Sequence, residues 1–166
     1  MKRALLLGTH SFIDGGSKVG MQHLAEGLAR RGWQVDYVAT ASSPFDLWGM
    51  QRHSRLRRAW LGRQGDQGGP IEPGLREYAF KALFPAHKLL LRSAWQLKTF
   101  CWLAPSWLGT REYTLCMHEA SPNVLYFPPV RAQVRVFRLA DWPDGFGHDL
   151  HPVLIDRFAQ LQRASA

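Results

Sequence analysis

The sequence predicts an α/β fold, a Rossmann-like parallel sheet flanked by helices, and three stretches carry this prediction. Residues 3–8 are a short apolar run of the kind that is buried inside parallel sheets. Residues 21–29 repeat apolar side chains three and four positions apart, as the buried stripe of a helix does. Residues 35–40 predict a second strand. Together they indicate a βαβ unit, and open α/β sheets of this kind build their sites at the carboxyl ends of the strands.

Glycines flank the predicted helix. Gly15 and Gly16 lie in the loop before it, and Gly32 follows two arginines as a left-handed cap. The loop contains neither GxGxxG nor GxxxxGK[ST], so it does not match the known phosphate-binding loops. Asp36 lies near the position of a ribose-binding acid, but without those glycines the signal is weak. HExxH, paired CxxC and GxSxG motifs are also missing, so metal and serine-hydrolase chemistry are unsupported.

The remainder of the chain continues the α/β pattern. Residues 65–74 are rich in glycine and proline and predict an exposed linker. Residues 76–104 predict mainly helix, 113–118 and 133–139 predict two further strands, and 151–161 predict a last helix.

Composition points to an anionic partner. Lysine and arginine number 21 against 13 acidic residues, which gives a net charge of +8, and the chain has seven tryptophans. Basic charge alone suits nucleic acid, an anionic membrane or an acidic substrate. Tryptophan favours the headgroup region of bilayers, so the combination favours a membrane surface. A basic, soluble domain without such a partner is the alternative.

Length and cysteine usage bound the class of protein. We expect one domain over residues 1–166, long enough to bury a substantial core. The sequence contains no run of 18 apolar residues, so it predicts no membrane-spanning helix. Cys101 and Cys116 lack metal-ligand spacing and lie in apolar surroundings, so we expect reduced core thiols in a cytoplasmic protein.

Two stretches combine basic and tryptophan side chains. One is the basic block at residues 52–63, and the other lies within residues 85–104. Apolar side chains cover more than one face of the second, which fits either a core helix or a helix in a membrane interface. The candidate membrane- or anion-binding residues are Arg52, Arg55, Arg57, Arg58, Trp60, Lys88, Arg92 and Trp95.

Four polar residues follow predicted strands and should share the carboxyl edge of the sheet: His10, Ser42, Glu119 and Asp141. Asp141 can serve as a general base in a cleft or cap a turn. His10 can position a substrate or anion, or simply be polar surface. Glu119 can orient a hydroxyl, or bind Arg138 or Arg135 structurally; the residues alone favour neither.

Three separated segments match one family in the right order. Residues 7–12 (Leu-Gly-Thr-His-Ser-Phe) are similar to a strand followed by a Ser-His-Asp-Phe-like loop. Residues 28–32 (Leu-Ala-Arg-Arg-Gly) match a helix end, and residues 136–141 (Val-Phe-Arg-Leu-Ala-Asp) are similar to Val-Tyr-Arg-Ala-Ser-Asp at a strand end. The chain thus resembles the N-terminal domain of GT-B glycosyltransferases, most closely the bacterial GumK-type glucuronosyltransferases of exopolysaccharide biosynthesis. Residues 45–110 match nothing in that family firmly.

The resemblance implies one half of a GT-B fold and a mechanism. Asp141 matches the aspartate taken as the family's catalytic base, and Glu119 falls where the family has a glutamate after a strand. Asp141 would deprotonate a hydroxyl of a polyprenyl-diphosphate-linked oligosaccharide, which attacks the anomeric carbon of a nucleotide sugar with inversion and without a metal. His10, Ser42 and Glu119 are then expected to bind this acceptor.

The resemblance also implies partners and a location. The nucleotide-sugar donor binds mainly in a second α/β domain, which we expect to be absent from residues 1–166, so a donor-binding domain would come from elsewhere. The isolated chain is expected to transfer nothing and to need no cofactor of its own. Its basic block and tryptophan-rich segment would hold it on anionic lipid, peripherally on the cytoplasmic face of the plasma membrane, at about 1 kcal/mol for each basic contact.

Two other functions compete with this one. The chain could be a non-catalytic, Rossmann-like module that docks on a membrane or an acidic partner, in which case the basic block and not Asp141 carries function. It could instead bind nucleic acid with a steep salt dependence, but no recognised nucleic-acid motif supports that, so we expect no nucleic-acid partner.

Overall fold

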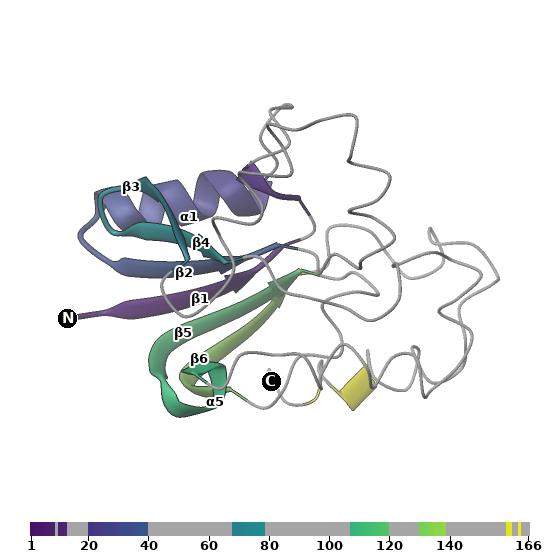
Figure 1. Cartoon of the computed structure of the whole chain (residues 1–166). Coiled ribbons are helices and arrows are strands. Elements are labelled where there is room, and N and C mark those ends of the chain that lie inside the picture. The colour runs from purple at the N-terminus through teal and green to yellow at the C-terminus, as the bar shows by residue number, and fades with distance from the viewer. Residues whose placement is uncertain are drawn as a thin grey trace, which may run out of the picture.

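The computed structural model describes residues 1–8, 10–12, 20–39, 68–78, 107–119, 130–138, 159–160 and 163. Their strands are β1 (Arg3–Leu7), β2 (Gln34–Val38), β3 (Gly69–Glu72), β4 (Leu75–Tyr78), β5 (Glu112–Glu119) and β6 (Arg131–Arg138), and the helical elements are α1 (Gly20–Arg30) and α5 (Trp107–Thr110). The strands form one sheet in the order β3-β4-β2-β1-β5-β6 (Figure 1). All neighbouring pairs are parallel except β3 with β4. The predicted α/β class is therefore confirmed as a mainly parallel sheet.

The βαβ unit predicted at the start of the chain is present. β1 and β2 pair in parallel, and α1 forms the crossover between them. Gly32 has a φ of 80°, and its N–H donates to the carbonyl of Ala29 at 2.9 Å. The N–H of Trp33 donates to the carbonyl of Leu28 at 3.2 Å. Gly32 is thus the left-handed cap expected from the sequence, and these bonds satisfy carbonyls that the helix end leaves open.

The hydrophobic core lies between α1 and one face of the sheet. The apolar stripe of α1 buries Met21, Ala25 and Ala29 against Leu6 of β1 and Tyr37 of β2. Fully burying a side chain of leucine size contributes about 1.5–3 kcal/mol, so this stripe fixes the orientation of α1 on the sheet. The adjacent strand positions point to the opposite face, because successive side chains alternate.

The linker predicted over residues 65–74 is contradicted where the structure describes it. Residues 69–72 are β3, and residues 75–78 are β4, so the start of the helix predicted over residues 76–104 is wrong as well. The rest of that predicted helix, residues 79–104, lies outside the described residues.

Gly74 forms the turn of a β-hairpin in this segment, so its glycine content reflects a turn between two strands and not a linker. Gly74 has a φ of 83° at the turn, and its carbonyl accepts the N–H of Val35 at 2.7 Å, which joins the turn to β2. Leu75 follows and is fully buried in the core. Four-residue strands carry too little periodicity to be recognised, and pairing with β2 overrides the local helix preference.

The two later strands are confirmed. β5 and β6 pair in parallel, with Glu119 opposite Arg138 at their carboxyl ends. Of the last helix predicted over residues 151–161, Ala159 and Gln160 are described and are helical. Arg163, two residues beyond the predicted end, is also helical, and its Nε donates to the carbonyl of Ala159. Among the described residues no helix is long and apolar enough to cross a bilayer.

Candidate functional site

The carboxyl ends of the parallel strands lie at one edge of the sheet, called here the carboxyl edge. Leu7 of β1 is in register with Val38 of β2 and with His118 of β5. His10, three residues after β1, and Glu119, the last residue of β5, therefore belong to the same edge, as the sequence predicts. Figure 1 shows β1, β2, β4, β5 and β6 ending on the same side of the molecule. Ser42 and Asp141 lie outside the described residues.

Tyr37 fixes the loop after β1. Its hydroxyl donates to the carbonyl of His10 at 2.7 Å, and its ring meets Phe12 edge to face with the centroids 5.0 Å apart. Gly8 makes this possible, because a Cβ there would collide with the Tyr37 hydroxyl. The chain is thereby fixed at His10 and Phe12, while the imidazole of His10 is exposed. That exposure fits either of the two interpretations of His10.

Glu77, which the sequence analysis does not single out, anchors the same loop. Its carboxylate is buried on β4, and Oε1 accepts the Ser11 hydroxyl at 2.6 Å and the Phe12 N–H at 2.9 Å. A charged acceptor makes these bonds stronger than neutral ones. The sequence does not identify Glu77 as a site residue, because its segment predicts a helix and no motif indicates a buried carboxylate there.

Glu119 forms an ion pair with Arg138. Nη1 of Arg138 lies 3.4 Å from Oε1 of Glu119, whose side chain is 8% exposed against 36% for the arginine. A Cβ at Gly20 would lie 2.5 Å from Nη2 of Arg138, so the guanidinium packs directly against the start of α1. Of the two alternatives for Glu119, the structure shows the bond to Arg138. Arg135 instead donates to the carbonyl of Val130.

The carboxyl edge therefore carries positive charge near a helix start. The amino end of an α-helix has a partial positive charge and exposed N–H groups, both of which attract anions. Arg138 adds a full charge there, which Glu119 neutralises in part. Because Arg138 keeps about a third of its side chain exposed, its free donors remain accessible to an anionic group.

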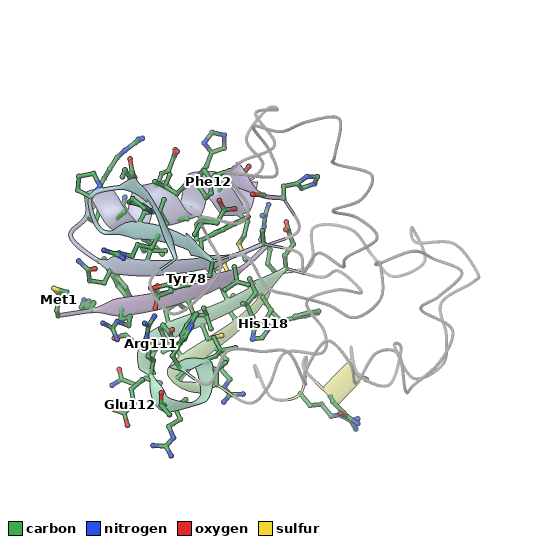
Figure 2. The ribbon with its side chains drawn as sticks, viewed as in Figure 1. Met1, Phe12, Tyr78, Arg111, Glu112 and His118 are labelled. Carbon is green, nitrogen blue, oxygen red and sulfur yellow. The ribbon has the colours of Figure 1, made fainter. Side chains whose placement is uncertain are left out.

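A second polar cluster lies on the sheet face opposite α1. The Asp36 carboxylate accepts hydrogen bonds from Tyr113 at 2.8 Å, Arg111 at 3.2 Å and Tyr78 at 3.3 Å. The Arg111 guanidinium lies 4.1 Å from the centre of the Trp107 ring. The cluster thus ties β2, β4, β5 and α5 together (Figure 2). The Asp36 carboxylate thus binds donors of the protein itself. This structural role accounts for Asp36 without a ribose-binding function.

The two tyrosines of this cluster are held neutral. Burial raises the pKa of Tyr113, and the nearby Asp36 carboxylate raises it further. Burial also raises the pKa of Tyr78, although the hydrogen bond from Arg111 opposes it. Neutral hydroxyls can donate to Asp36, whereas phenolates would repel it.

Cys116 is the buried thiol that the sequence predicts. Its Sγ lies 3.2 Å from Nε2 of His118. A cysteine beside a histidine suggests a nucleophile, but burial raises the pKa of Cys116 to about 12. The thiolate is the reactive form, so this thiol is inert at neutral pH. Cys101 lies outside the described residues.

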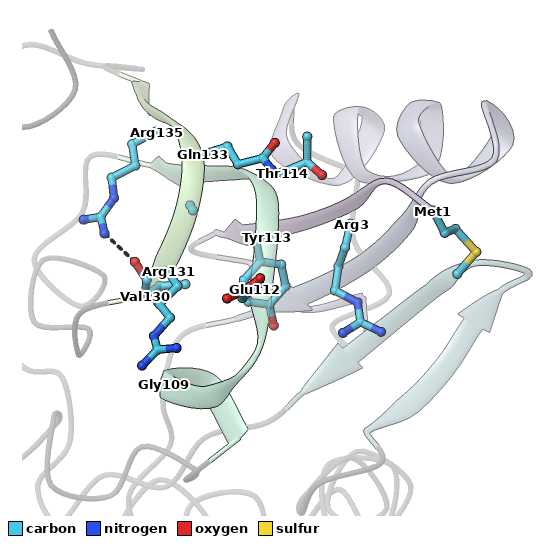
Figure 3. A pocket seen from close by; sticks show the side chains of 11 residues that line it. Met1, Arg3, Gly109, Glu112, Tyr113, Thr114, Val130, Arg131, Gln133 and Arg135 are labelled. Atoms are coloured by element: carbon cyan, nitrogen blue, oxygen red, sulfur yellow. Dashed lines mark hydrogen bonds between the residues drawn. The ribbon is translucent and has the colours of Figure 1, made fainter.

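A groove lies at the opposite edge of the sheet, where β1, β5 and β6 begin (Figure 3). It measures about 690 Å³ and is lined by arginines, a glutamate and polar groups at the strand starts. It does not coincide with the predicted site, because His10, Glu119 and Arg138 belong to the carboxyl edge. In the described part of the chain, no group of three His, Cys, Asp or Glu side chains could hold a metal.

The remaining predicted binding residues are not described by the structure: Arg52, Arg55, Arg57, Arg58, Trp60, Lys88, Arg92 and Trp95. Searches with protein-family models, with curated proteins and with solved structures found no match to this chain.

Proposed function

We propose that this chain is the acceptor-binding α/β half of a membrane-associated, inverting glycosyltransferase of the GT-B, GumK-like kind. One observation carries the proposal: Glu119 and Arg138 pair at the carboxyl edge of a parallel sheet, directly against the start of α1. Asp141 follows Arg138 by three residues, and the loop with His10 follows the neighbouring strand β1. These are the segments on which the family resemblance rests.

The proposed reaction is a transfer of a sugar to a hydroxyl. Asp141 takes the proton of an acceptor hydroxyl, and the oxygen forms a bond to the anomeric carbon of a nucleotide sugar. The bond between that carbon and the nucleotide's phosphate oxygen breaks, and the nucleoside diphosphate leaves with the bonding electrons. A carboxylate in a partly desolvated cleft is a suitable general base.

The other edge residues have positioning roles in this proposal. His10 and Ser42 orient the lipid-linked glycan, and Glu119 holds Arg138 in place. The exposed part of Arg138 and the start of α1 favour the diphosphate of the acceptor. In this proposal the nucleotide-sugar donor is bound by a second α/β domain, and transfer requires that domain together with this one.

Membrane attachment belongs to the same proposal. The basic block at residues 52–63 and the tryptophans of residues 85–104 place the chain on anionic lipid at the cytoplasmic face of the plasma membrane. A lipid-linked acceptor lies at that surface, so attachment and acceptor binding support each other.

The experiment is substitution of Asp141 in the chain combined with its donor-binding domain. Asp141→Asn should abolish sugar transfer and leave vesicle binding unchanged, because the amide cannot accept the proton. Asp144→Asn removes the same charge three residues later and serves as the matched control. Full transfer by Asp141→Asn would remove the proposed base.

A non-catalytic module that docks on a membrane or an acidic partner is the second candidate. The observation in its favour is that Asp36, Glu77 and Glu119 all bind protein groups in the structure. In that case substitutions in the basic block, such as Arg57→Gln with Arg58→Gln, should abolish vesicle binding and function together. Asp141→Asn should then be neutral.

A further inference from the structure

The groove where β1, β5 and β6 begin is rich in arginine. Arg3 comes from β1, whereas Arg131 and Arg135 come from β6. Arg131 and Arg135 are exposed, and Arg3 is half-buried. Figure 3 shows Arg3 and Arg131 projecting to the same side of the strands, with Tyr113 between them. Three cations from two non-adjacent strands thus line one concave surface.

Most of this positive charge is uncompensated by the residues that the structure describes. Glu112 is the acidic residue in the groove lining, and it faces Arg131 across the β5–β6 pair. Among the described residues, neither Arg3 nor Arg131 forms a salt bridge. Arg135 donates to the carbonyl of Val130, which orients it but does not neutralise it. Like charges gathered on one surface repel one another, so an anion that bridges them relieves this repulsion.

We propose that this groove binds a ligand through its phosphate groups. A guanidinium holds phosphate oxygens with two parallel hydrogen bonds, and a phosphate offers at least three acceptor oxygens. One carboxylate would be satisfied by one arginine, whereas three arginines suit a diphosphate or several phosphates. Thr114 and Gln133 add a hydroxyl and an amide to the lining. The groove volume of about 690 Å³ lies within the range of small-molecule sites.

This site is independent of the function proposed above. The groove lies at the amino ends of the strands, and the predicted acceptor site lies at their carboxyl ends. Substitutions in the groove can therefore be tested without touching His10, Glu119 or Asp141.

The test is calorimetric titration of the full chain with inorganic pyrophosphate. Arg131→Gln and Arg3→Gln should each weaken binding about tenfold or more, because each removes charged hydrogen bonds to phosphate. Glu112→Gln should tighten binding about twofold by removing an opposing, solvent-screened charge. A gain in affinity cannot result from misfolding.

Arg31→Gln is the matched control. Arg31 is exposed after α1 and does not line the groove, so this variant loses the same charge elsewhere. It should bind pyrophosphate as the wild type does. The proposal is overturned if the wild type does not bind pyrophosphate, if Arg131→Gln binds it as tightly as the wild type does, or if Arg31→Gln weakens binding as much as Arg131→Gln.

A second measurement identifies the source of the phosphate. Wild type and Arg131→Gln are floated with phosphatidylcholine vesicles that contain or lack phosphatidic acid. Flotation that requires phosphatidic acid and is lost in Arg131→Gln identifies a lipid headgroup as the ligand. If flotation is unchanged by Arg131→Gln while pyrophosphate binding is lost, the ligand is a soluble phosphate compound.

Discussion

Tyr37 and Glu77 hold the loop after β1 from the two strands beyond it. Tyr37 bonds the carbonyl of His10, and Glu77 bonds Ser11 and the N–H of Phe12. Three such bonds restrict the backbone at residues 10–12, so the exposed imidazole of His10 starts from a fixed backbone position. This preorganisation suits a binding residue, because less entropy is lost when a ligand arrives.

Gly8 and Tyr37 should be energetically coupled. Gly8→Ala should cost about 1–3 kcal/mol of unfolding free energy, because the added Cβ collides with the Tyr37 hydroxyl. Tyr37→Phe should cost about 1 kcal/mol for the lost bond to His10. The double variant should cost less than the sum by at least about 0.5 kcal/mol, since the colliding hydroxyl is gone. Urea unfolding followed by circular dichroism measures all three, and additive costs would contradict the packing described here.

At the scale of elements, glycine has different roles in the interior of α1 and at the turns that follow α1 and β3. Gly27 lies in the interior of α1 with nothing within 4 Å of its Cβ position, so it has no packing role. Gly32 and Gly74 have positive φ values of 80° and 83°, where a side chain is strained. Both of these end one element and turn the chain toward the next.

Substituting alanine at two glycines of this helix region should have opposite effects. Gly27→Ala should stabilise the protein by about 1 kcal/mol, because alanine is the better helix former. Gly32→Ala should destabilise it by about 1 kcal/mol, because the left-handed conformation penalises a Cβ. Urea midpoints of the two variants against wild type test this. A loss of stability in Gly27→Ala would mean that something packs against that face of α1.

On the scale of the whole molecule, the two faces of the sheet are stabilised differently. One face packs α1 through apolar side chains, and the other joins β2, β4, β5 and α5 through the Asp36 cluster. Removing one partner of a buried polar network leaves the others unsatisfied. The cluster therefore makes the stability of the second face sensitive to pH.

Stability should fall at alkaline pH. Cys116, Tyr78 and Tyr113 have pKa values raised by burial, from 9.0 to about 12 for Cys116 and upward from 10.0 for the tyrosines. Raised values favour the neutral forms in the folded state. The contribution of these three groups to the free energy of unfolding is therefore complete below about pH 9. It is lost as the pH rises through their pKa values in the folded state.

Urea unfolding at pH 8 and at about pH 10.5 measures this loss. The urea midpoint should be lower at the higher pH, and absorbance at 295 nm should show phenolate appearing together with unfolding. Cys116→Ala should remove the part of the pH dependence that begins near pH 9. An unchanged midpoint would contradict the burial of these groups.

Much of the fold could be predicted from local patterns, and the reasons are visible in particular elements. The apolar stripe of α1 has the period of a helix, and β1, β2 and β5 are short stretches rich in apolar and aromatic residues, so the sequence predicts these elements correctly. β3 and β4 were missed because four residues carry no measurable period. Within the site, His10 and Glu119 were found by their place after strands, whereas Glu77 was not.

The sequence by itself determined the βαβ unit, the helix cap at Gly32 and the sharing of one edge by His10 and Glu119, because these depend on periodicity and on parallel strand direction. The tertiary structure decided which partners the charged groups take. Glu119 binds Arg138, Asp36 binds two tyrosines and Arg111, and Glu77 holds the first loop. It also gathered Arg3 and Arg131 in one groove. The pairings of these acidic groups join residues 19 to 77 positions apart. No local pattern encodes them, since they follow from the order in which the strands are placed in the sheet.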